Sequence, residues 1–311
     1  MPIVIQVKQL SKQYGDMKAV DNLSFSVYTG DVYGFLGQNG AGKSTTIRML
    51  LTLIKPSSGN IQMFGMDLES KRKEILQQVG AVIERPDLYK YLTAYENLKL
   101  FARMSGLYPE KKMLEAQLDQ VGLLTRAHSK VHTFSQGMKQ RLGIAVALVH
   151  DPQLIILDEP TNGLDPQGIA DIRNLILDLS RNRGKTVLIS SHLLNEIEMV
   201  ASRMIIIDKG RKIVEGTVGE LFDNRSMLVS LQLNNPETVK IALANTRWQA
   251  FVKEQHQQII IFQLDKELLP LLTRDLVNMG AEITALQPQH SLEAYFLSLT
   301  TANRHVDTFA N

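Results

Sequence analysis

A glycine-rich segment, GQNGAGKST at residues 37–45, has the composition of a loop that binds phosphate. It fits the pattern G-x-x-x-x-G-K-[ST], in which glycines let backbone N–H groups wrap closely around phosphate oxygens. The lysine of this pattern reaches the β- and γ-phosphates of a nucleotide, and the Ser or Thr hydroxyl holds Mg²⁺. A chance match in a glycine-rich turn is the alternative, but a strand candidate precedes the loop and a helical stretch follows it. We expect nucleotide contacts from Gly37, Asn39, Gly40, Gly42, Lys43, Ser44 and Thr45, with Lys43 also catalytic and Ser44 a metal ligand.

In a second segment, LIILDEP at 154–160, four apolar residues are followed by two residues with carboxylate side chains. If this strand and the strand before the phosphate loop are neighbours, both acids lie beside the loop. Asp158 is then expected to hold Mg²⁺ through water. Glu159 points elsewhere and is expected to polarise a water for in-line attack on the γ-phosphate. The alternative, two surface acids that cap the next helix, loses weight because the phosphate loop is present.

Composition limits the classes of function that these residues can serve. The 311 residues include 34 Lys+Arg, 32 Asp+Glu and no Cys, for a net charge of +2. This balance gives no bulk attraction to nucleic acid, so no nucleic-acid partner is expected. The lack of Cys excludes a disulfide scaffold, a zinc–thiolate site and a Cys nucleophile. The longest apolar stretch, 142–149, is far shorter than the roughly 20 residues of a membrane span, and Lys8 interrupts any signal-peptide core.

Hydrophobic patterns predict the elements that must position the two motifs. Residues 1–65 are predicted to be rich in strands, and residues 67–150 mostly helical. The helix after the phosphate loop is expected from Ser44 to Ile54, with Pro56 beyond its end. Short apolar strands at 32–36, 153–157, 186–190 and 204–208 alternate with helices at about 167–181 and 193–200, and 212–216 is strand-like. This alternation predicts an α/β fold with a mainly parallel sheet.

The pattern changes near residue 225. Strand-like runs at 227–233, 249–253, 257–264 and 282–287 alternate with helices that begin at Pro236 and span about 266–279. The order is β-α-β-β-α-β, which is typical of a split-βαβ unit, and an amphipathic helix is expected at 291–300. We therefore predict two domains, 1–224 and a small α+β domain at 225–311.

Three further motifs narrow the family: FSQGMKQRL at 134–142, NGLDP at 162–166 and SSH at 190–192. Their order and spacing resemble the ATP-binding subunits of ABC transporters over about residues 1–222. The resemblance implies a P-loop NTPase core with a mainly parallel sheet, an antiparallel β subdomain and a helical subdomain at about 85–150. It also implies that ATP and Mg²⁺ are the cofactors.

The resemblance also implies roles for single residues. Tyr14 matches the aromatic residue that stacks on adenine, and His192 matches the switch histidine that contacts the γ-phosphate. Ser135 and Gly137 match the signature motif, which contacts ATP bound to the other subunit. Asp165 matches the loop that crosses the dimer interface. Two copies would sandwich two ATP molecules head to tail, with Lys43, Glu159 and His192 as the catalytic set.

Two residues depart from the common family pattern. Gln136 replaces the first glycine of the usual signature, so a side chain stands where many relatives have none. Glu84, in VGAVIERPDLY, stands where Gln is usual and where the side chain touches Mg²⁺ and the attacking water, so we expect it to be a metal ligand. The chain resembles the bacitracin- and lantibiotic-resistance group of ABC exporters in three features: an acid at this position, the segment SxGMKQRLGIA, and the closing segment SLEAYFLSLT.

The leading hypothesis is the ATP-hydrolysing subunit of an ABC exporter that powers a separate membrane permease. It would dock through the region at about 85–110 and lie peripherally on the cytoplasmic side of the membrane. The alternative is an ABC ATPase that acts on ribosomes or DNA without transport. A P-loop kinase or small GTPase is disfavoured by the signature motif and by NGLDP. Residues 225–311 carry no chemical motif, and packing, dimer contact and regulation all stay open for them.

Overall fold

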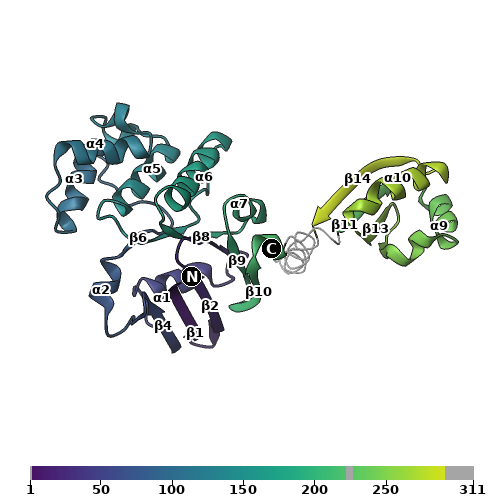
Figure 1. The fold of residues 1–311 in the computed structure, drawn as a ribbon, viewed down its shortest axis with the longest axis horizontal. Coiled ribbons are helices and arrows are strands. Elements are labelled where there is room, and N and C mark those ends of the chain that lie inside the picture. Colours follow the sequence, from purple (N-terminus) through teal and green to yellow (C-terminus); the bar gives the residue numbers. More distant parts are fainter. Residues whose placement is uncertain (1, 222–226, 291–311) are drawn as a thin grey trace, which may run out of the picture. The chain divides into compact units, whose positions relative to one another are not determined.

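The computed structural model of this chain describes residues 2–221 and 227–290. Contacts divide the chain into two compact units, Met1–Val218 and Gly219–Asn311, called the first and second units here. Figure 1 shows the elements of both units, coloured along the sequence. No helix in the described ranges is both long and apolar enough to cross a membrane.

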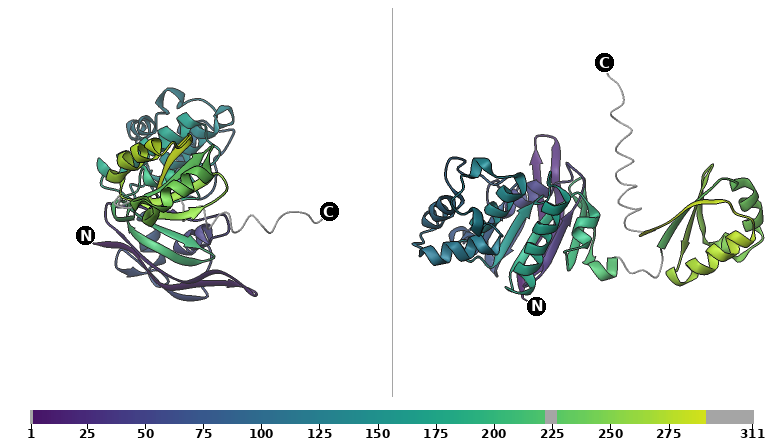
Figure 2. Two further views of the ribbon diagram at one scale, coloured as in Figure 1. Left: turned by 90° about the vertical axis from the view of Figure 1, so that its right-hand side faces the viewer. Right: turned by 90° about the horizontal axis from the view of Figure 1, so that it is seen from above.

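An antiparallel sheet forms one part of the first unit. Its strand order is β2-β1-β4-β5, with bounds β1 Ile3–Tyr14, β2 Met17–Tyr28, β4 Ser58–Met63 and β5 Met66–Asp67. The long β1–β2 hairpin (Figure 2) turns its alternating apolar side chains inward, so Ile5, Val7 and Val27 are buried. The predicted strand-rich character of residues 1–65 is confirmed.

A six-stranded sheet carries the phosphate loop and the carboxylates. Its order is β10-β9-β3-β8-β7-β6, with bounds β3 Val32–Leu36, β6 Val79–Val82, β7 Leu154–Asp158, β8 Thr186–Ser191, β9 Arg203–Asp208 and β10 Arg211–Thr217. Only β10 among these strands pairs antiparallel, so the predicted parallel α/β sheet is confirmed. Strands β3 and β7 are not neighbours, because β8 lies between them. The carboxylates therefore reach the loop across the end of β8.

Strand β6 lies inside the stretch that the sequence predicts to be mostly helical. It was missed because VGAV is short and contains a glycine, which weakens a strand pattern. The glycine has a packing reason: a Cβ on Gly80 would lie 2.2 Å from the Ala147 carbonyl oxygen. Helix α5 can therefore pass directly over β6.

Helices of the first unit pack on its six-stranded sheet or, like α3 and α4, lie together beyond α5 (Figures 1 and 2). Their bounds are α1 Lys43–Leu50, α2 Arg72–Leu76, α3 Ala94–Met104, α4 Lys111–Gln120, α5 Gln136–Ala147, α6 Pro166–Arg181 and α7 Leu194–Glu198, with 3₁₀ turns at Leu124–Arg126 and Val131–Thr133. A short helix, α8 Val218–Leu221, begins at the last residue of this unit. Helix α1 ends four residues before the predicted Ile54, because Thr52 adopts a φ of +56°, outside the helical region. Helix α3 begins at a capping box between Thr93 and Glu96.

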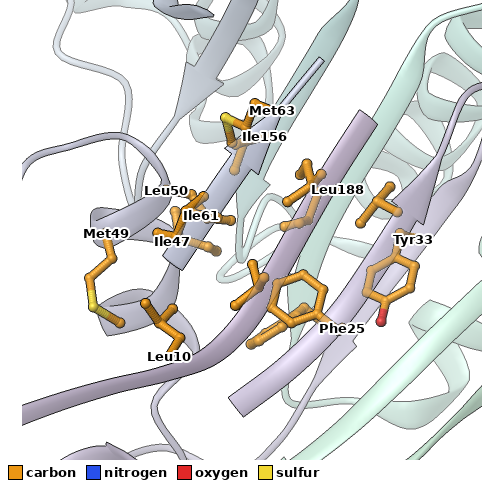
Figure 3. Packing of buried hydrophobic residues seen from close by; sticks show 14 of the residues in the cluster. Leu10, Phe25, Tyr33, Ile47, Met49, Leu50, Ile61, Met63, Ile156 and Leu188 are labelled. Carbon is orange, nitrogen blue, oxygen red and sulfur yellow. The ribbon is translucent and has the colours of Figure 1, made fainter. Parts of the chain in front are cut away.

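The core of the first unit fixes α1 in place. Figure 3 shows Ile47, Met49 and Leu50 of α1 beside Ile61 of the antiparallel sheet and Leu188 of the six-stranded sheet. All five side chains are buried, and full burial of such a side chain stabilises the fold by about 1.5–3 kcal/mol. Because α1 is held on both sides, the loop at its N-terminus has a fixed position.

The second unit contains a four-stranded antiparallel sheet of order β12-β13-β11-β14. Its elements are β11 Met227–Leu233, α9 Pro236–Ala244, η3 Arg247–Phe251, β12 Val252–Gln255, β13 Ile259–Leu264, η4 Lys266–Leu268, α10 Leu269–Asn278 and β14 Ile283–His290. This order of elements and strands is that of a split-βαβ unit. The strand expected at 249–253 begins only at Val252, because Thr246 caps a 3₁₀ turn that buries Trp248. The helix expected at 291–300 lies outside the described residues.

One face of the second unit's sheet carries its core. Val229 pairs with Phe262 and Leu231 with Ile260, so these side chains share a face. Both α9 and α10 contribute to the same cluster, through residues such as Leu243 of α9. Trp248 is 1% exposed, and its indole N–H donates to Asp275 at 3.0 Å. A buried indole needs such an acceptor.

Candidate functional site

The phosphate loop joins β3 to α1 and depends on glycine at two close approaches. A Cβ on Gly37 would lie 2.6 Å from the Ile207 carbonyl oxygen. Gly42 has a φ of +104°, and a Cβ there would lie 2.5 Å from the Ala19 carbonyl oxygen. Asn39 and Gly40 form an exposed tip between these two positions. The loop therefore follows a path that side chains would obstruct, with α1 starting directly behind it.

The Lys43 side chain is buried, with 5% of its surface exposed. Its Nζ donates to the carbonyl oxygens of Gly37 at 2.7 Å and Gln38 at 3.3 Å, and lies 3.1 Å from Glu159 Oε1. A buried ammonium group requires such partners. The lysine thus links the phosphate loop to the carboxylate at the end of β7.

Glu159 is held from three directions. Its Oε2 lies 2.8 Å from His192 Nδ1, and because an ionised carboxylate only accepts, the ring nitrogen is the donor. Its backbone N–H donates to Ser190 Oγ at 2.9 Å, and its Oε1 faces Lys43. The residue has a φ of +49°, a conformation that costs energy for any side chain other than glycine. Strain of this kind persists only where neighbouring contacts hold the residue in place.

Asp158 is fully buried at the end of β7 and is only half satisfied. Its Oδ1 accepts from Ser190 Oγ at 2.5 Å, whereas its Oδ2 has no hydrogen-bond partner. A buried, unpaired carboxylate oxygen is costly and marks a place where a cation or water fits. The donor set therefore fits Mg²⁺, with half-buried Ser44 in the first turn of α1 as the second predicted ligand.

Strand β8 supplies residues that the sequence analysis did not assign. Ser190 bridges Asp158 and the Glu159 backbone, and Ser191 Oγ donates to Glu196 at 2.9 Å. Thr161 Oγ1 donates to the same Glu196 oxygen at 2.7 Å. The signal was present in SSH at 190–192, where only the histidine was considered. A hydroxyl at the end of a central strand is well placed to reach both neighbouring strands.

The signature motif and NGLDP lie at two helix N-termini of the first unit. Ser135 caps α5 by accepting from the Met138 N–H at 3.2 Å, and Asp165 caps α6 by accepting from the Gly168 N–H at 2.9 Å. Ser135 is exposed, and Gly137 is partly exposed beside it. The start of α5 presents a hydroxyl group beside backbone N–H groups, the kind of place where an anion can bind, whereas the start of α6 carries the exposed carboxylate of Asp165.

Two predicted site residues make their contacts elsewhere. Tyr14 ends β1 with 46% of its surface exposed, and Lys12 Nζ lies 5.0 Å from its ring centroid. Glu84 has a φ of +56° and pairs with Arg48 of α1 at 2.5 Å. The structure thus brings Lys43, Glu159 and His192 into direct contact, links Asp158 to them through Ser190, and places Tyr14 and Glu84 in separate pairs. Their roles at adenine and metal stay predictions.

Comparisons with known proteins agree with this geometry. Residues 20–162 match the family model described as ABC transporter. The bacitracin transport ATP-binding protein of Bacillus licheniformis is 42% identical over 303 residues, which cover 96% of this chain and 98% of that protein. The linearmycin resistance ATP-binding protein of Bacillus subtilis is 36% identical, with 96% of this chain and 98% of that protein covered.

A solved structure is similar as well. It is a dimeric ATP-binding cassette in a post-hydrolysis state bound to ADP and phosphate, 26% identical with a TM-score of 0.62, covering 69% of this chain and 98% of that one. The predicted P-loop ABC ATPase fold and the ATPase activity are confirmed by these matches. Nothing in them supports the alternative of action on ribosomes or DNA. This chain, with its glycine-rich loop, Asp158, Glu159 and His192 in one cluster, belongs to the ATP-binding subunits of ABC transporters.

Proposed function

We propose that this chain is the ATP-hydrolysing subunit of an exporter that protects cells from antimicrobial peptides of the bacitracin type. Two copies would act with a separate membrane permease on the cytoplasmic side of the membrane. The observation that carries the catalytic part is the position of Glu159, held between Lys43 and His192 beside the phosphate loop. The names of the bacitracin transport relatives support the substrate class.

The contacts of Glu159 suggest how hydrolysis begins. Its two carboxylate oxygens face Lys43 and His192. When ATP fills the loop, Lys43 has phosphate oxygens to bind in place of Glu159, because a buried ammonium group pairs with the nearest strong acceptors. The freed oxygen of Glu159 can then accept a proton from a water aligned with the γ-phosphate. His192 keeps the carboxylate oriented through its other oxygen, and with both ring nitrogens protonated it could also donate to the γ-phosphate.

Asp158 and Ser44 would hold Mg²⁺ in this site. The partner-free Oδ2 of Asp158 supports this assignment, because a buried carboxylate oxygen without a donor invites a cation or its water. When bound, the ion neutralises charge on the β- and γ-phosphates. Ser190 keeps the carboxylate oriented by donating to the opposite oxygen. Glu84 would join the site only by leaving Arg48.

A head-to-tail dimer would complete each site. Ser135 and Asp165 lie at exposed helix starts, where a second copy can reach them. The dimeric cassette among the similar structures supports this arrangement. In it, Ser135 and Gly137 of one copy would contact ATP bound at Lys43 of the other.

The permease would dock on the helical part of the first unit. Large apolar side chains are exposed between residues 85 and 110: Tyr89 at 52%, Tyr91 at 84%, Met104 at 68% and Tyr108 at 87%. Exposed aromatic residues and methionine are enriched at protein interfaces. Docking there would place the chain at the membrane surface through its partner.

Replacing Glu159 with Gln in the chain–permease complex tests the catalytic proposal. The amide keeps the shape but cannot take a proton, so ATP turnover should fall about 100-fold or more, in line with the loss of a general base. The control is Glu69→Gln, an 84%-exposed glutamate of the same unit, which should turn over ATP at the wild-type rate. Wild-type turnover by Glu159→Gln would overturn the mechanism.

The substrate class is tested in cells. Deleting the gene should increase sensitivity to bacitracin, and the wild-type chain should restore resistance while Glu159→Gln should not. An unrelated antibiotic that acts inside the cell serves as the control compound. Unchanged bacitracin sensitivity in the deletion strain, with ATPase activity intact in the purified complex, would contradict the substrate class and leave the enzyme assignment standing.

A further inference from the structure

The departure at Gln136 has a structural counterpart in the same chain. Its side-chain Nε2 donates to the backbone carbonyl oxygen of Asn162 at 3.1 Å. Gln136 is the first residue of α5, directly after Ser135, and Asn162 begins NGLDP. The side chain that replaces the usual glycine therefore connects the signature motif to the loop that precedes α6.

The loop backbone is shaped to receive this side chain. Gly163 has a φ of +72°, and a Cβ there would lie 2.8 Å from Gln136 Nε2. A larger residue at 163 would therefore be strained and would also push the glutamine away. Close by, a Cβ on Gly137 would lie only 3.9 Å from Gly168 Cα, so the starts of α5 and α6 are in contact.

The same loop residue also contacts the backbone of the catalytic glutamate. The Asn162 N–H donates to the Glu159 carbonyl oxygen at 3.1 Å, while the Asn162 carbonyl oxygen accepts from Gln136. Glu159, Asn162 and Gln136 thus form a continuous hydrogen-bonded path through one residue. Glu159 itself is held at a φ of +49°, so a shift of this loop would change the position of its carboxylate.

We infer that Gln136 is a positioning residue that couples the two ATP sites of the dimer. This inference rests on the proposed head-to-tail arrangement, in which Ser135 meets ATP in the partner's site while Glu159 acts on ATP in its own. Through Asn162, the signature motif that senses one ATP is connected to the backbone of Glu159, the residue whose carboxylate acts on the other ATP. The Gln136 side chain places one hydrogen-bond donor at a fixed reach from the backbone, and it takes no part in the cleavage of ATP.

The test compares side chains of similar length at position 136 in the full chain with its permease. Gln136→Met removes the donor, and Gln136→Lys keeps one. We expect Gln136→Met to raise the half-saturating ATP concentration about fivefold, the ordinary effect of one hydrogen bond, and to lower the Hill coefficient toward 1. Its maximal turnover should fall far less than that of Glu159→Gln, because the Glu159 carboxylate itself is retained. Gln136→Lys should restore both values, and Gln77→Met, at an exposed glutamine after α2, is the matched control.

A double-mutant cycle with Gly163→Ala adds a second measurement. The backbone strain of alanine at 163 is present with either residue at 136, whereas the clash with Nε2 requires Gln136. Gly163→Ala should therefore lower cooperativity less in a Gln136→Gly chain than in the wild type. Additive effects, or identical behaviour of the Met and Lys variants, would overturn the inference. Glu159→Gln, measured alongside, separates the two proposals: if it does not lower turnover, the catalytic proposal itself fails.

Discussion

The two units of this chain differ in the kinds of side chain they bury and in which residues have a positive φ. In residues 2–221 and 227–290, each buried polar or charged side chain lies in the first unit, including Lys43, Asp158 and Ser190. So do the non-glycine residues with positive φ, such as Glu84 and Glu159. The buried residues of the second unit are apolar, and its positive φ falls on Gly280.

The difference indicates where the chain accepts a cost for function. Buried charges and strained backbone destabilise a fold unless neighbouring contacts compensate them. In the first unit some of these features, such as buried Lys43 and Asp158 and the positive φ of Glu159, lie at the ends of β7 and β8 and around the phosphate loop, whereas others, such as buried Asn97, lie elsewhere. The second unit follows the simple pattern of a sheet with one apolar face covered by two helices. Substitutions should therefore separate into losses of activity in the first unit and losses of stability in the second.

The largest expected effect on stability comes from Trp248→Ala. Removing the fully buried indole leaves a cavity and unpairs Asp275, which should destabilise the second unit by about 3–5 kcal/mol. Calorimetry should show a lower melting temperature for one transition, and binding of a non-hydrolysable ATP analogue should stay within twofold of wild type. Equal shifts of both transitions would show that the units unfold together and would break the comparison.

Ser190→Ala should lower ATP turnover and leave the stability of the second unit unchanged. The change removes a donor from Asp158 and an acceptor from the Glu159 backbone, a loss of about 1–3 kcal/mol that should lower turnover 10- to 100-fold. Trp248 is the only tryptophan in the chain, so its fluorescence reports the second unit and should not change. The control is Ser180→Ala, whose hydroxyl donates to the Gly30 carbonyl oxygen away from the site. Equal turnover in both variants would remove Ser190 from the account.

Acid should affect the second unit through Asp275. The hydrogen bond from the Trp248 indole, together with Arg247 and Arg274, holds the pKa of Asp275 below its ordinary value despite desolvation. A lowered folded-state pKa stabilises the fold above the unfolded-state pKa, and this stabilisation is lost as pH falls through the folded value. The difference in urea midpoint between wild type and Asp275→Asn, read from Trp248 fluorescence, should be full above about pH 4 and shrink below it. If the difference in urea midpoint became larger as the pH falls, the predicted lowering of the Asp275 pKa would be contradicted.

The smallest expected effect is at the Arg48–Glu84 pair. Both side chains are exposed, at 42% and 62%, so Arg48→Ala should change the free energy of unfolding by about 1 kcal/mol or less. If Glu84 is a metal ligand, Glu84→Ala should weaken the Mg²⁺ dependence of ATP hydrolysis while Arg48→Ala leaves it unchanged. Equal Mg²⁺ titrations for the two variants would assign Glu84 to the pair alone.

The sequence predicted the fold and the catalytic motifs more fully than it predicted the contacts between individual side chains. The phosphate loop, the buried strand before Asp158 and the alternating pattern after residue 225 depend on local spacing, which a sequence displays directly. The position of β8 between β3 and β7 depends on tertiary strand order, which local spacing does not carry. For the same reason the bridging role of Ser190 was missed.

Other differences between the predicted and the observed elements have local causes that override the hydrophobic pattern of the sequence. Strand β6 is hidden because a glycine needed for packing on Ala147 interrupts its apolar run. The turn at Arg247–Phe251 has a strand-like composition, but burial of Trp248 decides its conformation. The pairing of Glu84 with Arg48 joins two segments 36 residues apart, which only the folded chain brings together.

Counting trapped nucleotide in the Glu159→Gln chain tests the central claim most directly. The claim is that Glu159, positioned by Lys43 and His192, cleaves ATP in a site completed by a second copy. After incubation with ATP and Mg²⁺, the variant should run as a dimer that holds two uncleaved ATP molecules, and Lys43→Ala in the same background should abolish the dimer. A monomer that binds ATP, or a dimer that contains ADP, would contradict the account.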